Sequence, residues 1–146
     1  MKQFIQQAKE IAKKSTCQRQ KCGAVIVNNN QIIGQGFNSP PSESQRRCNI
    51  KKDQYHQKVT DKTCCVHAEQ RAIMDALKRN PDKLKGSQLF FMRLDLDNNV
   101  LFAGQPYCTI CSKMALDVGI KEFILYHKDG IKSYNTEKYN EISYLY

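Results

Sequence analysis

The sequence predicts an α/β fold, a three-layer α/β/α sandwich with a mixed central sheet of about five strands. Segments with apolar residues at helical spacing alternate with short β-branched segments in the order α-β-β-α-β-α-β. This order favours helices on both faces of one sheet. The length of 146 residues, 40% of them hydrophobic, suits one compact core. We therefore expect residues 1–146 to form a single domain.

The first third of the chain predicts a helix followed by a β-hairpin. Residues 2–14 place five apolar side chains on one helical face: Phe4, Ile5, Ala8, Ile11 and Ala12. Residues 22–27 are apolar and β-branched, and residues 28–30 are three asparagines that favour a turn. Residues 31–37 then predict the returning strand. Residues 38–63 lack periodicity and predict a long loop, which in a compact domain is commonly functional.

The middle of the chain predicts a helix and a further strand. From His67 an apolar stripe at helical spacing continues until Asn80, which precedes a proline that stops a helix. Residues 89–94 predict the third strand, and residues 100–103 a short hairpin arm after a turn.

The last third predicts one more helix and one more clear strand. A helix is expected over residues 108–118, because Gly119 ends the pattern there. Residues 122–127 predict the last clear strand. We expect the tail from Gly130 to pack back as helix or irregular structure.

The sequence has no sign of a membrane-spanning or exported protein. No apolar stretch approaches the roughly 18–20 residues of a membrane span, and Glu10 interrupts the N-terminal segment where a signal peptide needs an apolar run. We expect a cytoplasmic protein in a reducing compartment. Its seven cysteines then serve as metal ligands or small buried side chains rather than as disulfides.

The net positive charge of the chain lies almost entirely in its first half. The formal net charge is +9, and residues 1–62 contribute +8 of it, with 12 Lys and Arg against 4 Asp and Glu. Such asymmetry fits a partner that carries phosphate, from a nucleotide to a nucleic acid. Solvated lysines are the alternative explanation, since the chain holds 17 Lys against 6 Arg.

Two short motifs point to a metal site. A His-Ala-Glu motif at residues 67–69 and a Pro-Tyr-Cys-Thr-Ile-Cys motif at residues 106–111 each open a predicted helix. The two cysteines share one face of a helical turn, where the helix N-terminus favours thiolate. One imidazole and two thiolates suit a tetrahedral zinc ion with an open fourth position for water, whose pKa zinc lowers to about 7. The predicted zinc ligands are His67, Cys108 and Cys111.

Glu69 decides between a catalytic and a structural reading of this site. Its carboxylate follows His67 by two positions, close enough to move protons without binding the metal. A structural zinc site has no use for a proton shuttle and is normally closed by a fourth protein ligand. Cys64 or Cys65 is the candidate for that fourth ligand, so the geometry of these thiols discriminates between the two readings.

With these motifs the sequence resembles the zinc-dependent cytidine and deoxycytidylate deaminase superfamily, whose signature is H-x-E followed by P-C-x-x-C. The resemblance covers residues 4–127, and four segments are most similar to the deoxycytidylate deaminase branch: 15–19, 22–27, 36–40 and 67–73. Two features depart from the family pattern. Tyr107 separates the proline from the first cysteine, and the 41 positions from His67 to Cys108 exceed the spacing in compact members.

The resemblance implies a cytidine deaminase-like fold and the hydrolytic deamination of a cytosine nucleotide or nucleoside, with dCMP to dUMP foremost. Zinc hydroxide would attack C4 of the ring while Glu69 carries protons to N3 and to the departing amine. The resemblance also implies that Asn38 hydrogen-bonds the sugar or base and that the backbone of Ala68 lies near the ring. Asn38 as an ordinary turn residue is the alternative.

Basic residues in the loops expected to rim the pocket are candidates for phosphate recognition, because the planar arginine fork suits phosphate oxygens. These residues are Arg19, Arg46, Arg47, Lys51 and Lys52. We assign substrate binding to Arg46 and Arg47, with a solvated loop as the alternative.

The remaining cysteines and histidines have separate interpretations. Some deoxycytidylate deaminases carry a second, structural zinc, and its candidate ligands here are Cys17, Cys48, His56 and Cys65, with free thiols as the alternative. Cys22 lies in an apolar strand and is expected in the core. His127 is expected to be an ordinary surface or hydrogen-bonded histidine.

Two other functions remain open from the sequence. One is deamination of a base in RNA, such as the wobble adenosine of tRNA, which the positive first half would favour. The other is a non-catalytic, zinc-stabilised module of the same fold. The resemblance further implies a pyrimidine nucleotide or nucleoside as partner and a homo-oligomer as assembly.

Overall fold

The computed structural model describes residues 1–43 and 65–146. Within these residues lie four α-helices: α1 Lys2–Ala12, α3 Ala68–Arg79, α4 Thr109–Val118 and α5 Thr136–Ser143. The strands of the same residues are β1 Lys21–Asn28, β2 Gln31–Phe37, β3 Gln88–Leu94, β4 Val100–Leu101, β5 Glu122–His127 and β6 Gly130–Asn135. Two short 3₁₀ segments, Pro41–Glu43 and Pro81–Lys83, follow β2 and α3.

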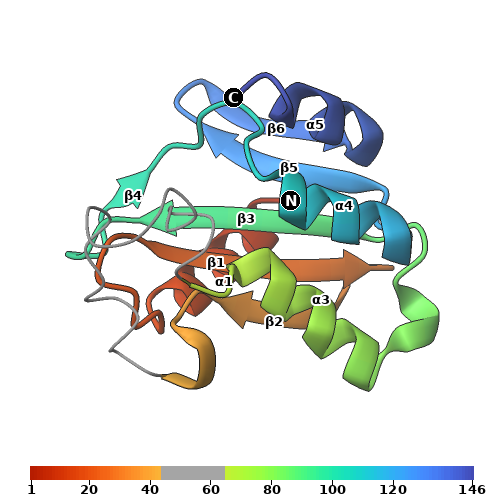
Figure 1. The fold of residues 1–146 in the computed structure, drawn as a ribbon, viewed down its shortest axis with the longest axis horizontal. Coiled ribbons are helices and arrows are strands. Elements are labelled where there is room, and N and C mark those ends of the chain that lie inside the picture. Colours follow the sequence, from red (N-terminus) through yellow and green to blue (C-terminus); the bar gives the residue numbers. More distant parts are fainter. Residues whose placement is uncertain (44–64) are drawn as a thin grey trace, which may run out of the picture.

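The six strands form one mixed sheet in the order β2-β1-β3-β5-β6, with the short β4 paired to β3 (Figure 1). The central pair β3 and β5 is parallel, and every other pair is antiparallel. The mixed sheet, the hairpin of β1 and β2, and the short arm at β4 confirm the sequence prediction. The sheet has one strand more than expected.

The additional strand is β6, so the expectation of helix or irregular structure from Gly130 onward is wrong for residues 130–135. β6 lies at the edge of the sheet, and none of its residues is buried. It therefore lacks the alternation of apolar and polar residues by which a half-buried strand is recognised. Its pairing with β5 is made by a two-residue turn after which Gly130 has a φ of 126°. The following helix, α5, agrees with the prediction for the tail.

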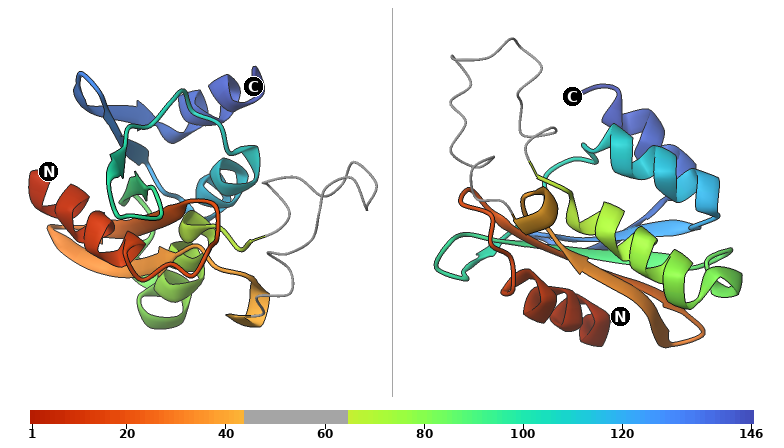
Figure 2. Two further views of the ribbon diagram at one scale, coloured as in Figure 1. Left: turned by 90° about the vertical axis from the view of Figure 1, so that its left-hand side faces the viewer. Right: turned by 60° about the horizontal axis from the view of Figure 1, so that its bottom comes forward.

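Helices cover both faces of the sheet and so complete the predicted three layers (Figure 2). On one face α1 buries Phe4, Ile5 and Ala8 against the central strands. On the other face α3, α4 and α5 lie side by side. Their core includes side chains from the sheet and all three helices: Ile26, Leu89, Phe123, Ala72, Ala115 and Tyr139. The site described below lies on this second face.

Two glycines of β2 let α3 approach the sheet closely. A Cβ atom on Gly34 would lie 2.5 Å from the backbone oxygen of Ala72. A Cβ atom on Gly36 would lie 2.5 Å from the Cβ of Arg71. Both distances are far below van der Waals contact, so only glycine permits this packing. The close approach sets the height of α3, and therefore of its first residues, above the sheet.

No helix in the described part of the chain is both long enough and apolar enough to span a membrane. The structure has no disulfide among the described cysteines Cys17, Cys22, Cys65, Cys108 and Cys111.

Candidate active site

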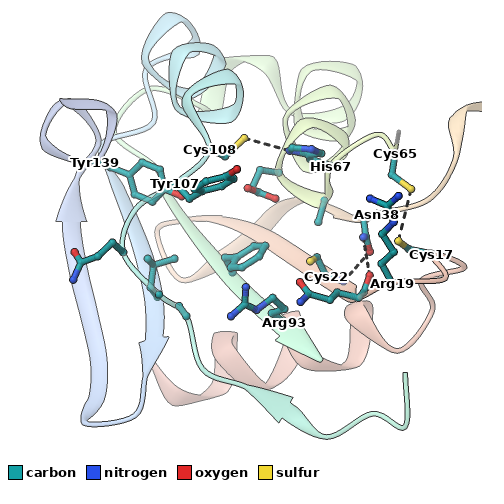
Figure 3. Close-up of a pocket in the computed structure, with 18 residues that line it drawn as sticks. Cys17, Arg19, Cys22, Asn38, Cys65, His67, Arg93, Tyr107, Cys108 and Tyr139 are labelled. Atoms are coloured by element: carbon teal, nitrogen blue, oxygen red, sulfur yellow. Dashed lines mark hydrogen bonds between the residues drawn. The ribbon is translucent and has the colours of Figure 1, made fainter. Parts of the chain in front are cut away.

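A cavity of about 430 Å³ opens between the first turns of α3 and α4 and the sheet strands β1 and β3 (Figure 3). Its volume lies in the range of small-molecule sites. The lining joins residues far apart in the sequence: Cys17, Arg19, Gln20, Cys22, Asn38, Cys65, His67, Ala68, Glu69, Phe91, Arg93, Ala103, Gly104, Gln105, Tyr107, Cys108, Leu125 and Tyr139.

His67 enters the cavity because it is the residue at which α3 begins. It has extended backbone angles, φ −73° and ψ 152°, and its backbone N–H donates to the side-chain oxygen of Gln70 at 2.9 Å. This capping contact satisfies a donor that the first helical turn leaves without an intrahelical partner. Just before it, Val66 pairs with Ser39 in an isolated β-bridge. The start of α3 is thus held from both sides, which orients the imidazole.

Cys108 occupies the same position at the start of α4. Its backbone is extended, and its sulfur accepts a hydrogen bond from the backbone N–H of Cys111 at 3.3 Å. The hydroxyl of Ser112 donates to the carbonyl of Cys108 at 3.0 Å, and Asn140 of α5 donates to that hydroxyl at 2.9 Å. At its other end α4 closes on Gly119, whose φ of 88° is left-handed. The helix therefore presents both cysteines toward the cavity.

These two helix starts bring four ligating side chains together: His67, Glu69, Cys108 and Cys111, whose ligating atoms all lie within 4.8 Å of one another. The Nδ1 atom of His67 is 3.2 Å from each of the two sulfurs. The sulfurs are 2.7 Å apart and are not bonded to each other. An imidazole and two thiols that converge on one point match the donor set of a catalytic zinc ion. The chain can hold zinc here.

The position of Cys65 shows whether it can be a fourth protein ligand of the zinc site. Its sulfur lies 3.7 Å from the sulfur of Cys17, and it does not belong to the cluster of His67 and the two other cysteines. Cys65 therefore does not close the zinc site. Cys64 lies outside the described residues. Within the described chain, Glu69 is the additional ligating group beside the imidazole and the thiols.

The electrostatics of the cluster favour a bound cation. The hydrogen bond with Cys111 lowers the pKa of Cys108 to about 5 against the effect of burial, and His67 acts in the same direction. The same hydrogen bond and burial raise the pKa of Cys111. Burial, followed by the charge of Cys108, raises the pKa of Glu69, which is 6% exposed. A zinc ion would compensate this concentration of buried acidic groups.

Asn38 lies at the wall of the cavity and is tied into the backbone around it. Its side-chain oxygen accepts from the backbone N–H of Cys22 at 2.7 Å and from the hydroxyl of Ser15 at 2.6 Å. Its side-chain nitrogen donates to the carbonyl of Gln20 at 2.9 Å. Asn38 is not among the described residues with positive φ, so its place does not depend on the left-handed conformation that asparagine tolerates. Its side chain joins the end of β2 to the segment before β1.

The other predicted site residues divide into three groups. Ala68 is fully buried at the start of α3 and lines the cavity. Cys17 and Cys65, two of the four candidates for a second zinc, are brought together by the fold. The candidates Arg46, Arg47, Cys48 and His56 lie outside the described residues.

Two further predictions can be compared with the structure. Cys22 was expected in the core, but it is only partly buried and lines the cavity beside the core. His127 is hydrogen-bonded, as expected, with Nδ1 2.9 Å from the carbonyl of Ala103 and Nε2 2.9 Å from the hydroxyl of Tyr134. Since a carbonyl only accepts, His127 carries its proton on Nδ1. This contact holds Ala103 at the cavity wall.

Tyr139 and Arg93 are cavity residues to which the sequence analysis gave no role. Tyr139 comes from α5, with its ring stacked on that of Phe123 at 4.2 Å between centroids, and burial raises the pKa of its hydroxyl. No motif surrounds it, so no signal in the sequence identified it. Arg93 does have a signal, because it interrupts an otherwise apolar strand.

Comparisons with known proteins agree with this geometry. The family model described as "Cytidine and deoxycytidylate deaminase zinc-binding region" matches residues 1–127. A deoxycytidylate deaminase of Schizosaccharomyces pombe is 27% identical over 143 residues, which are 93% of this chain and 38% of that protein. This chain therefore spans less than half the length of that relative. A deoxycytidylate deaminase of Mycobacterium phage D29 is 28% identical over 135 residues, covering 87% of this chain and 93% of the phage protein.

A solved structure is similar over most of the fold. It is the dCMP deaminase of cyanophage S-TIM5 in complex with dCMP and dUMP, which is 28% identical with a TM-score of 0.60. The similarity covers 84% of this chain and 76% of the phage chain. The four-residue cluster, the three-layer fold and the family match over residues 1–127 lead to one conclusion. The chain belongs to the family of cytidine and deoxycytidylate deaminases.

Proposed function

We propose that the protein catalyses the hydrolytic deamination of dCMP to dUMP. The observation that carries this proposal is the buried carboxyl group of Glu69 beside an imidazole and two thiols, in a cavity large enough for a nucleotide. A structural zinc site would have no use for that carboxyl group. The similarity to dCMP deaminases of two phages and of a yeast supports dCMP as the substrate.

Each residue of the cluster then has a role. His67, Cys108 and Cys111 hold the zinc ion, which when bound supplies an activated water molecule for attack on C4 of the cytosine ring. Glu69 accepts a proton from that water and delivers it to N3, and then accepts the remaining proton of the hydroxyl added at C4 and delivers it to the departing amine. Cytosine and water become uracil and ammonia. Burial of Glu69 favours its protonated form, which is the form that donates to N3.

Ala68 and Asn38 are proposed to position the substrate. Ala68 lines the cavity and lies between His67 and Glu69 in the sequence, and its backbone is assigned to the ring. The amide of Asn38 is assigned to the sugar or base, and its three hydrogen bonds to the protein hold it rigidly at the wall. Arg46 and Arg47 remain the predicted binding residues of the segment outside the described chain.

We also propose a second, structural zinc ion bound by Cys17, Cys48, His56 and Cys65. The distance of 3.7 Å between the sulfurs of Cys17 and Cys65 supports two of the four ligands. A pair of neighbouring thiols suits zinc, and an ion at this place would join the segment before β1 to the segment before α3.

The cellular setting and assembly are proposals as well. A nucleotide substrate is consistent with the cytoplasm, as is the absence of a disulfide among the described cysteines. Large apolar side chains exposed on α3 and α4 are consistent with a homo-oligomer: Met74, Leu77 and Leu116. We take residues 1–146 as one domain.

The test of the proposed function is ammonia release from a panel of substrates. The panel contains dCMP, cytidine, deoxycytidine, cytosine, guanine and tRNA, each with the unaltered protein and with Glu69→Ala. We expect the highest kcat/KM with dCMP and no release with Glu69→Ala. Deamination of tRNA alone, with affinity that falls steeply with salt, would establish an RNA-directed enzyme instead. No release from any substrate by the zinc-loaded protein would establish a non-catalytic module.

A further inference from the structure

Arg93 is a cation of the cavity that no carboxylate of the described residues neutralises. It lies in β3 opposite Cys22 of β1, and it follows Leu89 and Phe91 on the face of the sheet that carries the site. Leu89 belongs to the core on this face, and Phe91 lines the cavity. Arg93 is the next residue on this face, so its guanidinium group lies where the apolar core ends and the cavity begins.

The contacts of Arg93 satisfy little of its hydrogen-bonding capacity. Its Nη2 atom donates to the carbonyl of Phe102 at 2.8 Å. Its Nε atom is shielded from solvent and has no acceptor among the described residues. No carboxylate of the described chain forms an ion pair with it, whereas the surface residue Arg79 is paired with Asp75 at 2.6 Å. A partly buried guanidinium group without an acid is unfavourable unless an anion is bound during function.

The place of Arg93 in the cavity fits the far end of a nucleotide. Figure 3 shows it at the opposite side of the cavity from His67 and Cys108, with the floor of β1 and β3 between them. A cytosine ring held at the metal cluster, with its sugar and phosphate directed across the floor of the cavity, would bring the phosphate to Arg93. Arg19 also lines the cavity, so a second guanidinium group contributes positive potential to it.

We infer that Arg93 binds the 5′-phosphate of the substrate and thereby makes the enzyme select a nucleoside monophosphate over a nucleoside. This inference rests on the proposed deaminase function. The planar fork of arginine presents parallel N–H donors to two phosphate oxygens, and such charged hydrogen bonds are stronger than neutral ones. The contact with Phe102 holds the guanidinium group in place, so little ordering is required when the phosphate arrives.

The experiment compares dCMP with deoxycytidine in three variants. Arg93→Gln removes the charge, Arg93→Lys keeps the charge but removes the fork, and Arg79→Gln is the matched control on the surface. With Arg93→Gln we expect kcat/KM for dCMP to fall about 10- to 100-fold, mainly through KM, and kcat/KM for deoxycytidine to change less than about 3-fold. Arg93→Lys should lie between this variant and the unaltered protein, and Arg79→Gln should match the latter.

If Arg93 only supports the β4 arm, its substitution should affect kcat/KM for dCMP and for deoxycytidine alike. Equal losses with dCMP and deoxycytidine, or no loss with either, would overturn the inference. If Arg93→Gln does not fold, the same comparison with Arg93→Lys decides.

A binding measurement separates this inference from the proposed function. Inorganic phosphate should raise the thermal unfolding midpoint of the unaltered protein and have a smaller effect on Arg93→Lys and Arg93→Gln. A protein that releases no ammonia from either compound contradicts the deaminase proposal, yet it can still show this phosphate effect. An identical phosphate effect in all variants, or none in the unaltered protein, would contradict the assignment of Arg93.

Discussion

The Nδ1 atom of His67 lies 3.2 Å from the sulfur of Cys108, although 41 positions separate the two residues. Each residue caps the helix that follows it, so the distance is set by how α3 and α4 lie on the sheet. The distances between the ligating atoms of the metal cluster therefore depend on how the two helices pack against the same face of the sheet. Changes in that packing and changes in the ligands should have separable effects.

Replacing Glu69 with glutamine should abolish proton transfer while preserving the shape of the site. We expect kcat to fall by about 10²- to 10⁴-fold, because general acid-base catalysis contributes an effect of this size. Zinc content and the thermal unfolding midpoint should remain near those of the unaltered protein. Glu141→Gln, which changes an exposed carboxylate on α5, is the control and should leave kcat unchanged. A Glu69→Gln enzyme with full kcat would refute the proton-shuttle role.

Elemental analysis should find two zinc ions per chain. Cys108→Ser removes a ligand of the cluster, so it should retain one zinc ion and lose activity. Cys17→Ser removes a ligand of the proposed structural site, so it should also retain one zinc ion. That ion lies in the intact cluster, so this variant should keep activity. One zinc ion in the unaltered protein, absent only in Cys108→Ser, would eliminate the second site.

Removing zinc with a chelator should lower stability as well as activity. Without the ion, a carboxyl group and two thiols remain buried within 4.8 Å of the imidazole nitrogen. Their desolvation is then uncompensated, so the thermal unfolding midpoint should fall, and added zinc should restore it together with activity. A chelated protein with an unchanged midpoint would contradict this electrostatic account of the cluster.

The approach of α3 to the sheet should be sensitive to a single methyl group. Gly34→Ala places a Cβ atom 2.5 Å from the backbone oxygen of Ala72, so the helix must shift. We expect a loss of about 1–3 kcal/mol in the free energy of unfolding. Gly104→Ala is the control, since no atom lies within 4 Å of its new Cβ, and its effect should stay within about 0.5 kcal/mol. Equal effects of the two substitutions in denaturant unfolding would contradict the packing argument.

Asn38 should contribute to stability in addition to any role toward substrate. Asn38→Ala leaves the N–H of Cys22, the hydroxyl of Ser15 and the carbonyl of Gln20 without this partner, which should cost about 1–3 kcal/mol. Asn38→Asp keeps an acceptor for the first two groups but turns a second acceptor toward the carbonyl of Gln20, so it should be destabilising as well. A change below about 0.5 kcal/mol in Asn38→Ala would show that these hydrogen bonds are replaced by water.

Local patterns were sufficient to predict most of the fold. The helical spacing of Phe4, Ile5 and Ala8 identified α1, and the glycine at position 119 identified the end of α4. These signals can be recognised in the sequence alone, because the side chains of a helix or a half-buried strand return to the same environment every few residues. β6 was missed because all its residues are at least partly exposed at the sheet edge, where no such repeat is imposed.

The two motifs by themselves determine the donor set of the site. His67, Glu69, Cys108 and Cys111 carry their chemistry and their helix positions in the sequence, since each pair lies within one helical turn. Only the tertiary structure decided which other residues share their cavity. Arg93, Tyr139 and the pair of Cys17 and Cys65 reach it from separate elements. Sequence periodicity records which face of an element is buried, whereas the meeting of distant side chains depends on how the elements pack.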